Sequence, residues 1–460
     1  MDKDWIDGAE LQTIDVEQLR RWVDSCDPRS PIDVTDDRYF DLDEVTIDGE
    51  EVPLRGADHV QGLRDAVELS PARQSCQLFS GYSGTGKSTE LRRLAQRLEA
   101  EGFSVLIADA EEYLSLSRPL NLEDLLVIVA GAFGEATSAR IGEDVLKEGY
   151  WSRFADFLRR DVDLGDFKLP GGVVDFKVSI KDAIPFWAQL RGAVARSRGK
   201  LREHSHDFVR HCVTRLEKNE PRSRGVVFIL DSLERLSPIL PTQFGEVMAS
   251  VAQVFKDDAS YLRLPGCHVI YTIPPYARLV QPELGNLYDS VTHILPAIKV
   301  TERTKPYETY RPGVEALVEL VGRRIPITEV FGERRDLLED LVAYSGGHVR
   351  TLLTFVRDLL RRSLRGGLPP TRKMVEEVVQ YFREPARTRV FQEDVPVLWK
   401  ILQQGAVEDF SKAEHAVLAS LMNDYLVLCY RNGHGWFEVH PLVRDLVEKL
   451  ALRRGLEGSS

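Results

Sequence analysis

Five short runs of apolar residues stand out in the first three hundred positions of the chain. They are CQLFS at 76–80, FSVLIAD at 103–109, GVVFILD at 225–231, CHVIYTI at 267–273 and HILPAIKV at 293–300. Most of these runs are almost continuously apolar, the pattern of strands buried on both faces of a parallel sheet. Helical stretches separate them, so the pattern predicts a doubly wound α/β domain over residues 49–300.

The interval between the second and third runs is much longer than one crossover helix requires. It contains three stretches of helical pattern and one turn-rich piece that suits a hairpin: LEDLLVIVAGAFG, YWSRFADFLRR, HDFVRHCVTRLEK and FKLPGGVVDFKV. We interpret residues 112–222 as a mostly helical insertion into the sheet domain.

Beyond residue 300 the apolar spacing becomes helical, with breaks at GG (346–347) and GGLPP (366–370). This region, 301–385, is predicted to be a helical lid domain. Residues 386–460 give two helical stretches, then LVLCYRNGHGWFEVH, which reads as two strands around a turn, and a final helix. Helices followed by a hairpin predict a winged-helix domain.

The charge of the chain is concentrated at its beginning. Residues 1–60 contain 18 Asp and Glu against 6 Lys and Arg, and this excess accounts for the whole net charge of −12. We define residues 1–48 as an acidic N-terminal segment. Two interpretations stay open: a solvated arm, or a docking or autoinhibitory segment that meets a basic surface such as residues 191–224.

Composition favours a cytoplasmic protein. The N-terminus MDKDWIDGAE has no basic and apolar signal pattern, and the longest apolar run, LLVIVAGAFG, is far too short for a membrane helix. The five cysteines are scattered without a C-x-x-C pair, which argues against a zinc site or a disulfide framework.

The stretch GYSGTGKS at 81–88 matches G-x-x-x-x-G-K-[ST] in full. It follows a predicted strand and opens a predicted helix, the context in which backbone N–H groups cradle phosphates. Lys87 is expected to reach the β- and γ-phosphates of ATP or ADP, and Ser88 to bind Mg²⁺. The predicted nucleotide-binding residues of this loop are Gly81, Ser83, Gly84, Thr85, Gly86, Lys87, Ser88 and Thr89.

A second group of candidates follows later strands. Asp231, at the end of GVVFILD, is placed to hold Mg²⁺, and Glu234 to orient the attacking water, unless either one only caps the next helix. Ser232 occupies the position where an acid would be better placed as a base. Thr272 ends another strand and either senses the γ-phosphate or only packs, and Arg350 begins a helix after two glycines, where it either reaches the nucleotide or is solvated.

Together these residues resemble the AAA+ and STAND branches of P-loop ATPases over residues 50–450. LRGADHV (54–60) resembles the box that lines the adenine pocket, which implies that role for Arg55. DSLE resembles the NACHT form of the second motif, although Arg235 stands where a further acid is usual. YTIPP occupies the place of T-S-R-P, with Thr272 matching and Pro274 in place of the arginine. Arg350 matches the sensor II arginine of AAA+ lids.

The C-terminal end carries a further resemblance. WFEVHPLVRDLV is similar to the M-H-D-L motif that closes the winged helix of STAND nucleotide switches. That resemblance implies that His440 contacts the β-phosphate of ADP, although Pro441 replaces the aspartate and a histidine at this place is more often a local cap.

Two functions remain open. In the first, the chain is a STAND-like switch in which ADP holds a closed monomer, ATP permits oligomerisation or partner signalling, and slow hydrolysis resets the state. Its effector and sensor are then expected to be separate proteins, and a prokaryotic defence or multi-gene conflict system follows only by family analogy.

In the second, the chain is a DNA-associated AAA+ ATPase, an origin-binding or transposition regulator. The winged helix and Arg357, Arg361, Arg362 and Arg365 favour it, but residues 386–460 hold nine Lys and Arg against ten Asp and Glu, so nucleic-acid binding is not favoured. A metabolic kinase is the least favoured function, because no acceptor pocket is evident.

Overall fold

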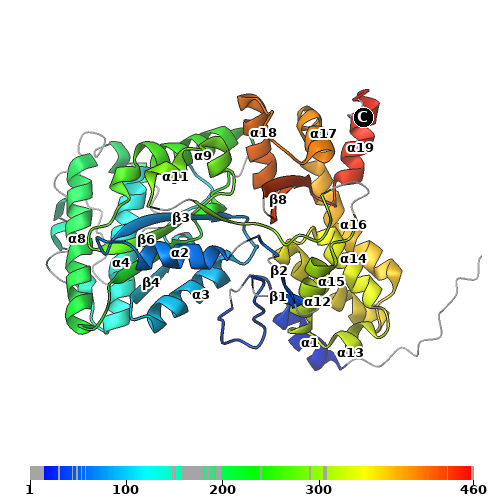
Figure 1. Cartoon of the computed structure of the whole chain (residues 1–460), viewed down its shortest axis with the longest axis horizontal. Coiled ribbons are helices and arrows are strands. Elements are labelled where there is room, and N and C mark those ends of the chain that lie inside the picture. Colours follow the sequence, from blue (N-terminus) through cyan, green and yellow to red (C-terminus); the bar gives the residue numbers. More distant parts are fainter. Residues whose placement is uncertain are drawn as a thin grey trace, which may run out of the picture. The chain divides into compact units, whose positions relative to one another are not determined.

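The computed structural model describes most of the chain: residues 15–29, 32–43, 45–47, 50–52, 54–56, 58–147, 149, 152–154, 156–157, 181, 187–188, 190–192, 198–238, 241–289, 292–303, 308–432 and 434–456 (Figure 1). It divides into two compact units. The sheet unit comprises His59–Gly81 and Glu90–Ile294. The lid unit comprises Met1–Asp58, Tyr82–Thr89 and Leu295–Ser460. The glycine loop is thus grouped with the C-terminal half of the chain. The domain boundaries expected from the sequence stay predictions.

The sheet unit is built on five strands in the order β4-β5-β6-β3-β7. Neighbouring strands from β4 to β3 are parallel, which confirms the α/β class. The bounds are β3 (Ser75–Gly81), β4 (Ser104–Asp109), β5 (Val226–Asp231), β6 (Cys267–Ile273) and β7 (His293–Leu295). The fifth predicted run, HILPAIKV, forms a strand only as far as Leu295 because Pro296 has no N–H for the sheet ladder.

Burial follows position in the sheet. Every residue of β3, β5 and β6 is buried, as their continuous apolar runs predict. The edge strand β4 differs, since Ile107 is 42% exposed. The sequence pattern did not reveal this exposure because an edge strand in this fold carries the same apolar residues as a central one.

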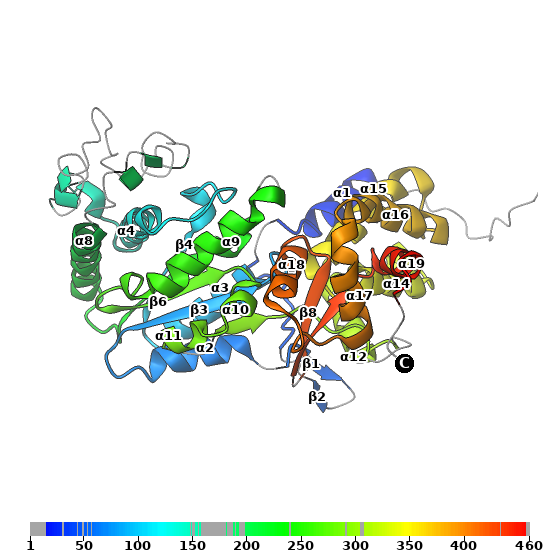
Figure 2. The ribbon, with the colours of Figure 1, turned by 90° about the horizontal axis from the view of Figure 1, so that it is seen from above.

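Helices cover both faces of the sheet, with α2 on one face and α4 and α9 on the other (Figure 2). The helix bounds in this unit are α2 (His59–Glu68), α3 (Lys87–Ala100, with its first turn grouped in the lid unit), α4 (Leu122–Ile141), α8 (Arg198–Asn219), α9 (Phe244–Ala252), α10 (Ala277–Val280) and α11 (Leu284–Leu287). Short turns of other helix types lie at 110–112, 145–147, 233–235, 241–243, 253–257 and 259–261.

Helices α4 and α8 belong to the predicted insertion and pack against each other. Helix α4 is buried almost throughout, and its acidic residues Glu123 and Asp124 are held by Arg198 and Arg191. The predicted hairpin FKLPGGVVDFKV lies outside the described residues, and YWSRFADFLRR is described only at 152–154 and 156–157.

The lid unit has a helical part and a hairpin part. The helical part comprises α1 (Val16–Ser25), α12 (Arg311–Gly322), α13 (Ile327–Phe331), α14 (Arg335–Ser345), α15 (Val349–Gly366) and α16 (Arg372–Thr388). The hairpin part comprises a short turn at 392–394, α17 (Val395–Gln404), α18 (Lys412–Asn423), β8 (Val427–Asn432), β9 (His434–Val439) and α19 (Arg444–Arg453). This order of helices and hairpin is typical of a winged helix, and that assignment stays a prediction. A further pair of short strands, β1 (Val45–Ile47) and β2 (Glu50–Val52), was not predicted.

The N-terminal segment, where the structure describes it, packs on the lid helices. Helix α1 lies against α15, with Leu19 4% exposed and Cys26 fully buried. Asp27 forms an ion pair with Arg357 over 3.3 Å, and the main-chain carbonyl of Arg38 accepts a hydrogen bond from Arg324. The described part of this segment therefore packs against α15 and contacts Arg324 and Arg357, and the two interpretations of the segment from the sequence stay predictions.

No helix in the described ranges is long and apolar enough to cross a membrane.

Candidate functional site

The glycine loop runs from the end of β3 to the first turn of α3 and folds tightly around one carbonyl group. The carbonyl oxygen of Tyr82 accepts hydrogen bonds from Thr85 Oγ1 over 2.9 Å and from Lys87 Nζ over 2.6 Å. Gly84 and Gly86 have φ of +93° and +98°, which only glycine adopts readily. A Cβ atom on Gly84 would lie 2.5 Å from Cβ of Arg350, so this glycine also permits close approach to a neighbouring helix. Ser88 and Thr89 follow in the first turn of α3, half-buried.

The neighbouring helix is α15, whose N-terminus is fixed to the loop. Its N-cap residue His348 lies 2.9 Å from the Ser83 carbonyl oxygen through Nε2. The backbone N–H of Arg350 donates to the Gly84 carbonyl over 3.0 Å, and its Nη1 donates to Ser83 Oγ over 2.8 Å. Arg350 therefore reaches the glycine loop, and the alternative of a merely solvated arginine is wrong.

Arg55 contacts the loop at another point. Its side chain is 1% exposed, and Nη2 donates to the Thr85 carbonyl over 2.8 Å. Asp43 lies 3.7 Å from Nη1 and supplies the counter-charge. Arg55 therefore supports the loop backbone, and the adenine contact implied by the family resemblance stays a prediction.

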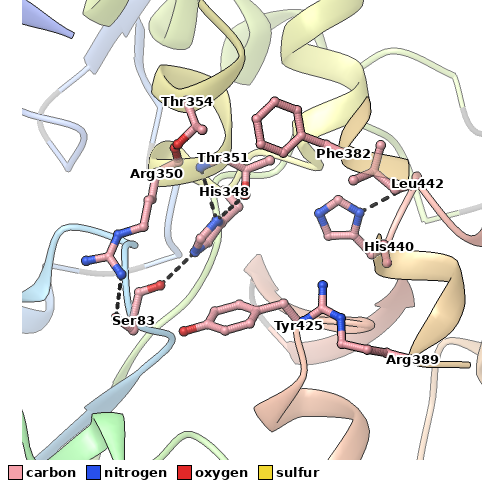
Figure 3. Close-up of a pocket in the computed structure, with 11 residues that line it drawn as sticks. Ser83, His348, Arg350, Thr351, Thr354, Phe382, Arg389, Tyr425, His440 and Leu442 are labelled. Carbon is pink, nitrogen blue, oxygen red and sulfur yellow. Dashed lines mark hydrogen bonds between the residues drawn. The ribbon is translucent and has the colours of Figure 1, made fainter. Parts of the chain in front are cut away.

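A cavity of about 280 Å³ lies within the lid unit beside these contacts (Figure 3). The glycine loop, helices α15 and α16 and the segments flanking the hairpin enclose it; its lining residues are Ser83, His348, Arg350, Thr351, Thr354, Phe382, Ala386, Arg389, Tyr425, His440 and Leu442. Two arginines and four hydroxyl groups face an interior that also carries aromatic rings. Such a lining suits a ligand that has both an anionic and an apolar or aromatic part.

His440 contributes a hydrogen-bond donor to this cavity. It is 5% exposed, and its Nδ1 accepts a hydrogen bond from the Leu442 N–H over 3.2 Å. Burial lowers the pKa of His440 to about 3, and the nearby His348 and Arg389 act in the same direction. The ring is therefore neutral, and its proton is carried by Nε2. Figure 3 shows this nitrogen facing the cavity interior, and it has no hydrogen-bond partner in the part of the chain that the structure describes.

His348 is neutral for the same reason. Burial lowers the pKa of His348 to about 4; the hydrogen bond to Ser83 opposes the shift, and Arg350 and Lys87 add to it. Because a carbonyl oxygen only accepts, Nε2 must carry the proton and donate to Ser83. The Nδ1 atom then accepts from Thr351, whose hydroxyl lies 2.7 Å away. In both buried histidines the proton is on Nε2. The Nε2–H of His348 donates to the Ser83 carbonyl, whereas that of His440 faces the cavity.

The acidic candidates belong to the sheet unit. Asp231 ends β5 and is 7% exposed, and its carboxylate accepts from the Ser232 N–H over 2.7 Å. Ser232 has φ of +70°, and the Thr272 hydroxyl accepts from the next N–H, that of Leu233, over 3.0 Å. Thr272 thus fixes the turn that follows Asp231, and its role as a phosphate sensor stays a prediction.

Glu234 is also buried, at 6% exposed, in the short helical turn after Asp231. The next residue, Arg235, pairs with Glu111. Asp109 ends β4 directly opposite Asp231 in the sheet register and caps the following turn through the Glu111 N–H. The carboxylates of Asp109 and Asp231 therefore end adjacent strands, although only the latter was predicted as a site residue.

Metal-binding residues are less defined. Among the residues described, no group of three or more His, Cys, Asp or Glu is arranged to hold a metal ion. Mg²⁺ usually takes only one or two protein oxygens beside phosphate and water, a set that Ser88 and Asp231 suit chemically. These two residues belong to different units, and their joint magnesium site stays a prediction.

Eight of the eleven residues that line the cavity were not predicted from the sequence, among them His348, Tyr425 and Arg389. His348 was visible as a polar residue directly before a helix, the place of an N-cap, but histidine is not among the preferred caps. Tyr425 has φ of +59°, a conformation that no pattern in the sequence reveals. Arg389 lies at the end of α16 and is placed by its hydrogen bond to the Asp424 carbonyl.

No protein-family model matches this sequence, and no curated protein matches it either. Among solved structures, the chain is similar to the Walker-type ATPase PABY2304 of Pyrococcus abyssi, with 13% identity and a TM-score of 0.39 over 85% of this chain and 95% of that one. It is also similar to the ORC2 protein of Aeropyrum pernix in its ADPNP–ADP complexes, with 14% identity and a TM-score of 0.40 over 90% and 98% of the two chains. The ORC1 protein of the same organism, solved in complex with DNA, gives 13% identity and a TM-score of 0.33 over 90% and 94%.

The chain has a parallel sheet, a glycine loop between β3 and α3, and an aspartate at the end of β5. These features are those of a P-loop NTPase fold, and the chain adds a helical part and a hairpin part to it.

Proposed function

We propose that this protein is an ATP-binding and ATP-hydrolysing switch of the STAND type, in which the bound nucleotide sets the conformation of the lid. One observation carries the proposal: Ser83 of the glycine loop, Arg350 of the lid and His440 after the hairpin line the same cavity. A ligand in that cavity contacts three chain segments at once. The charge and length of the ligand therefore change the relative free energies of the conformations that these segments adopt. This is the condition for a nucleotide to shift a conformational equilibrium.

The donors around the cavity suit a polyphosphate. Arg350 offers a charged guanidinium group, and neutral His440 offers an N–H that can donate to an anion without first gaining a proton. In this proposal Lys87 exchanges all or part of its contact with the Tyr82 carbonyl for phosphate oxygens. The backbone N–H groups of the glycine loop surround the phosphates, and Arg55 keeps the loop in shape.

Hydrolysis is expected to be slow. Mg²⁺ would be held by Ser88 and Asp231 and would neutralise charge on the transferred phosphoryl group. Glu234 is the candidate to orient water, but Ser232 occupies the position next to Asp231 and Arg235 is paired with Glu111. The acid set is therefore weak, which fits a timer better than a high-turnover enzyme.

The output of the switch is a change of assembly. We propose that ADP stabilises a closed monomer and that ATP releases the lid for homo-oligomerisation or for a separate effector or sensor protein. A role in a prokaryotic defence or multi-gene conflict system is the biological context that we propose by family analogy.

A DNA-associated ATPase is the second candidate, favoured by the order of helices and hairpin in residues 395–453. Charge weighs against it. Helix α18, which precedes the hairpin, carries one lysine and one glutamate. In the arginine-rich stretch of α15, Arg357 pairs with Asp27, and Arg362 pairs with Asp358 and Glu377. Of the four arginines in this stretch of α15, this leaves Arg361 and Arg365 for phosphate contacts.

The deciding experiment measures nucleotide content and mass together. The purified protein is assayed for ADP and ATP by chromatography after denaturation, and its mass is measured by light scattering with ADP, with ATP and Mg²⁺, and with neither. We expect a monomer with ADP and a larger species with ATP. K87A should bind neither nucleotide, and D231N should bind ATP but not hydrolyse it. Duplex DNA binding that requires ATP and weakens steeply with salt, without any change in mass, would instead establish the second candidate.

A further inference from the structure

Tyr82 connects the glycine loop to the hairpin through its backbone carbonyl and its side-chain hydroxyl. Its carbonyl oxygen accepts from Lys87 Nζ over 2.6 Å, and its hydroxyl donates to the Val427 carbonyl over 2.9 Å. The side chain between these two groups is 1% exposed. Lys87 is the residue expected to bind phosphate, and Val427 is the first residue of β8. A single buried residue therefore joins the phosphate-binding lysine to the hairpin.

Aromatic packing reinforces this connection. The ring of Tyr82 lies 6.1 Å from that of Tyr425, and Tyr425 lies 5.4 Å from His348. His348 in turn holds Ser83, the residue next to Tyr82 in the chain. The contacts form a closed ring of four residues: Tyr82 and Ser83 of the glycine loop, the N-cap residue of α15, and Tyr425, which lies two residues before β8. A shift of the Tyr82 backbone therefore changes contacts with both α15 and the hairpin.

Tyr425 is held in a strained conformation at this place. Its φ of +59° is uncommon for any residue other than glycine and is unfavourable for a bulky side chain. Such conformations persist only where the surrounding packing fixes them, and they concentrate at functional sites. The packing that fixes Tyr425 includes Tyr82 and His348, so loosening of the glycine loop also loosens the start of β8.

From these contacts we propose that Tyr82 is the residue through which the nucleotide state of the glycine loop is transmitted to the β8–β9 hairpin. The inference rests on the proposed function and specifies its regulation. A phosphate that draws Lys87 away from the Tyr82 carbonyl removes one of the contacts that orient this residue. The position of its hydroxyl then changes relative to Val427, and the hairpin gains or loses that hydrogen bond accordingly.

The test is hydrogen exchange of the hairpin, residues 427–439, in full-length protein with ADP, with ATP and Mg²⁺, and without nucleotide. In the wild type we expect exchange rates in the hairpin to differ between nucleotide states by about fivefold, the effect of one hydrogen bond. Y82F keeps the ring and removes only the hydroxyl. We expect this variant to bind nucleotide, measured in parallel by calorimetry, and to lose the nucleotide-dependent difference in the hairpin.

Y288F is the matched control. The Tyr288 hydroxyl is also buried and donates to a backbone carbonyl, that of Phe255, over 2.7 Å in the sheet unit. We expect this variant to be destabilised to a similar degree and to keep the hairpin response. A Y82F protein that binds nucleotide and responds like the wild type would overturn the role of Tyr82. If neither the exchange rates of the hairpin nor the mass of the wild type changes with nucleotide, the proposed switch is overturned instead.

Discussion

His348 Nε2 donates a hydrogen bond to the carbonyl oxygen of Ser83 over 2.9 Å. His348 is also the N-cap of α15, where its Nδ1 accepts from Thr351. One side chain therefore begins a lid helix and holds the glycine loop. This arrangement makes the position of the helix dependent on the conformation of the loop, because neither partner can shift without breaking a bond at a buried site.

Replacement of His348 separates these two roles. H348A removes both, and we expect it to lower the free energy of unfolding by about 2–3 kcal/mol, the sum of a lost cap and a buried carbonyl left without a donor. Asparagine is a preferred N-cap but is too short to replace the bond to Ser83, so H348N should recover about 1 kcal/mol. Urea-induced unfolding measures both. If H348N equals the wild type, the bond to the loop contributes nothing to stability.

His440 offers a similar separation. H440N retains an acceptor for the Leu442 N–H but lacks the donor that faces the cavity. We expect the Kd for ADP to rise about tenfold or more, the effect of losing one hydrogen bond to a charged group, and the fraction of assembled protein to rise with it. Calorimetry and light scattering give the two quantities. An unchanged Kd would remove His440 from the nucleotide site.

The N-terminal segment is predicted to support nucleotide binding through Asp43. The side chains of Asp43 and Arg55 are both 1% exposed, and Arg55 holds the Thr85 carbonyl. Removing one partner of a buried ion pair costs about 3–5 kcal/mol, so D43N should be strongly destabilised and bind ADP more weakly. D27N is the control, because Asp27 pairs with Arg357 of α15 and this pair is more exposed. Equal ADP affinity in both variants would confine Asp43 to a structural role.

Much of the fold was evident from the sequence. The apolar runs at β3, β5 and β6 gave the strands almost to the residue because these strands are buried on both faces. The glycine loop was evident for a different reason, since its residue types are dictated by backbone geometry at Gly84 and Gly86. Two signals failed where an edge or a proline intervened, at Ile107 and at Pro296.

The contacts between distant segments were not evident. Nothing in the local sequence shows that Tyr82 meets Val427, or that Arg55 holds Thr85, because these pairs depend on tertiary packing. The acidity of residues 1–60 left a solvated arm and a docking segment open, with residues 191–224 as an example of a basic surface, whereas the described contacts of the segment include Arg324 and Arg357. Net charge alone does not locate the surface against which an acidic segment packs.

The last prediction concerns pH. Burial lowers the pKa of His348 to about 4 and that of His440 to about 3, from 6.5 in the unfolded chain. The unfolded state therefore binds more protons between these values, and stability rises with pH. The contribution is fully present above pH 6.5 and is lost as pH falls, towards 4 for His348 and towards 3 for His440. Each histidine adds a slope of up to about 1.4 kcal/mol per pH unit to the free energy of unfolding in that window.

Urea unfolding from pH 7.0 to pH 4.5 measures this slope. The carboxylates titrate in the same range, and so does His268 in the sheet unit, whose pKa burial lowers to about 4. Their contributions cancel when wild type is compared with H348N and H440N, which lack one titrating ring each. We expect the loss of stability on acidification to be smaller in each variant and smallest in the double variant. Parallel pH profiles would mean that neither ring is held neutral by the fold, and the donor role assigned to His440 Nε2 would fall with them.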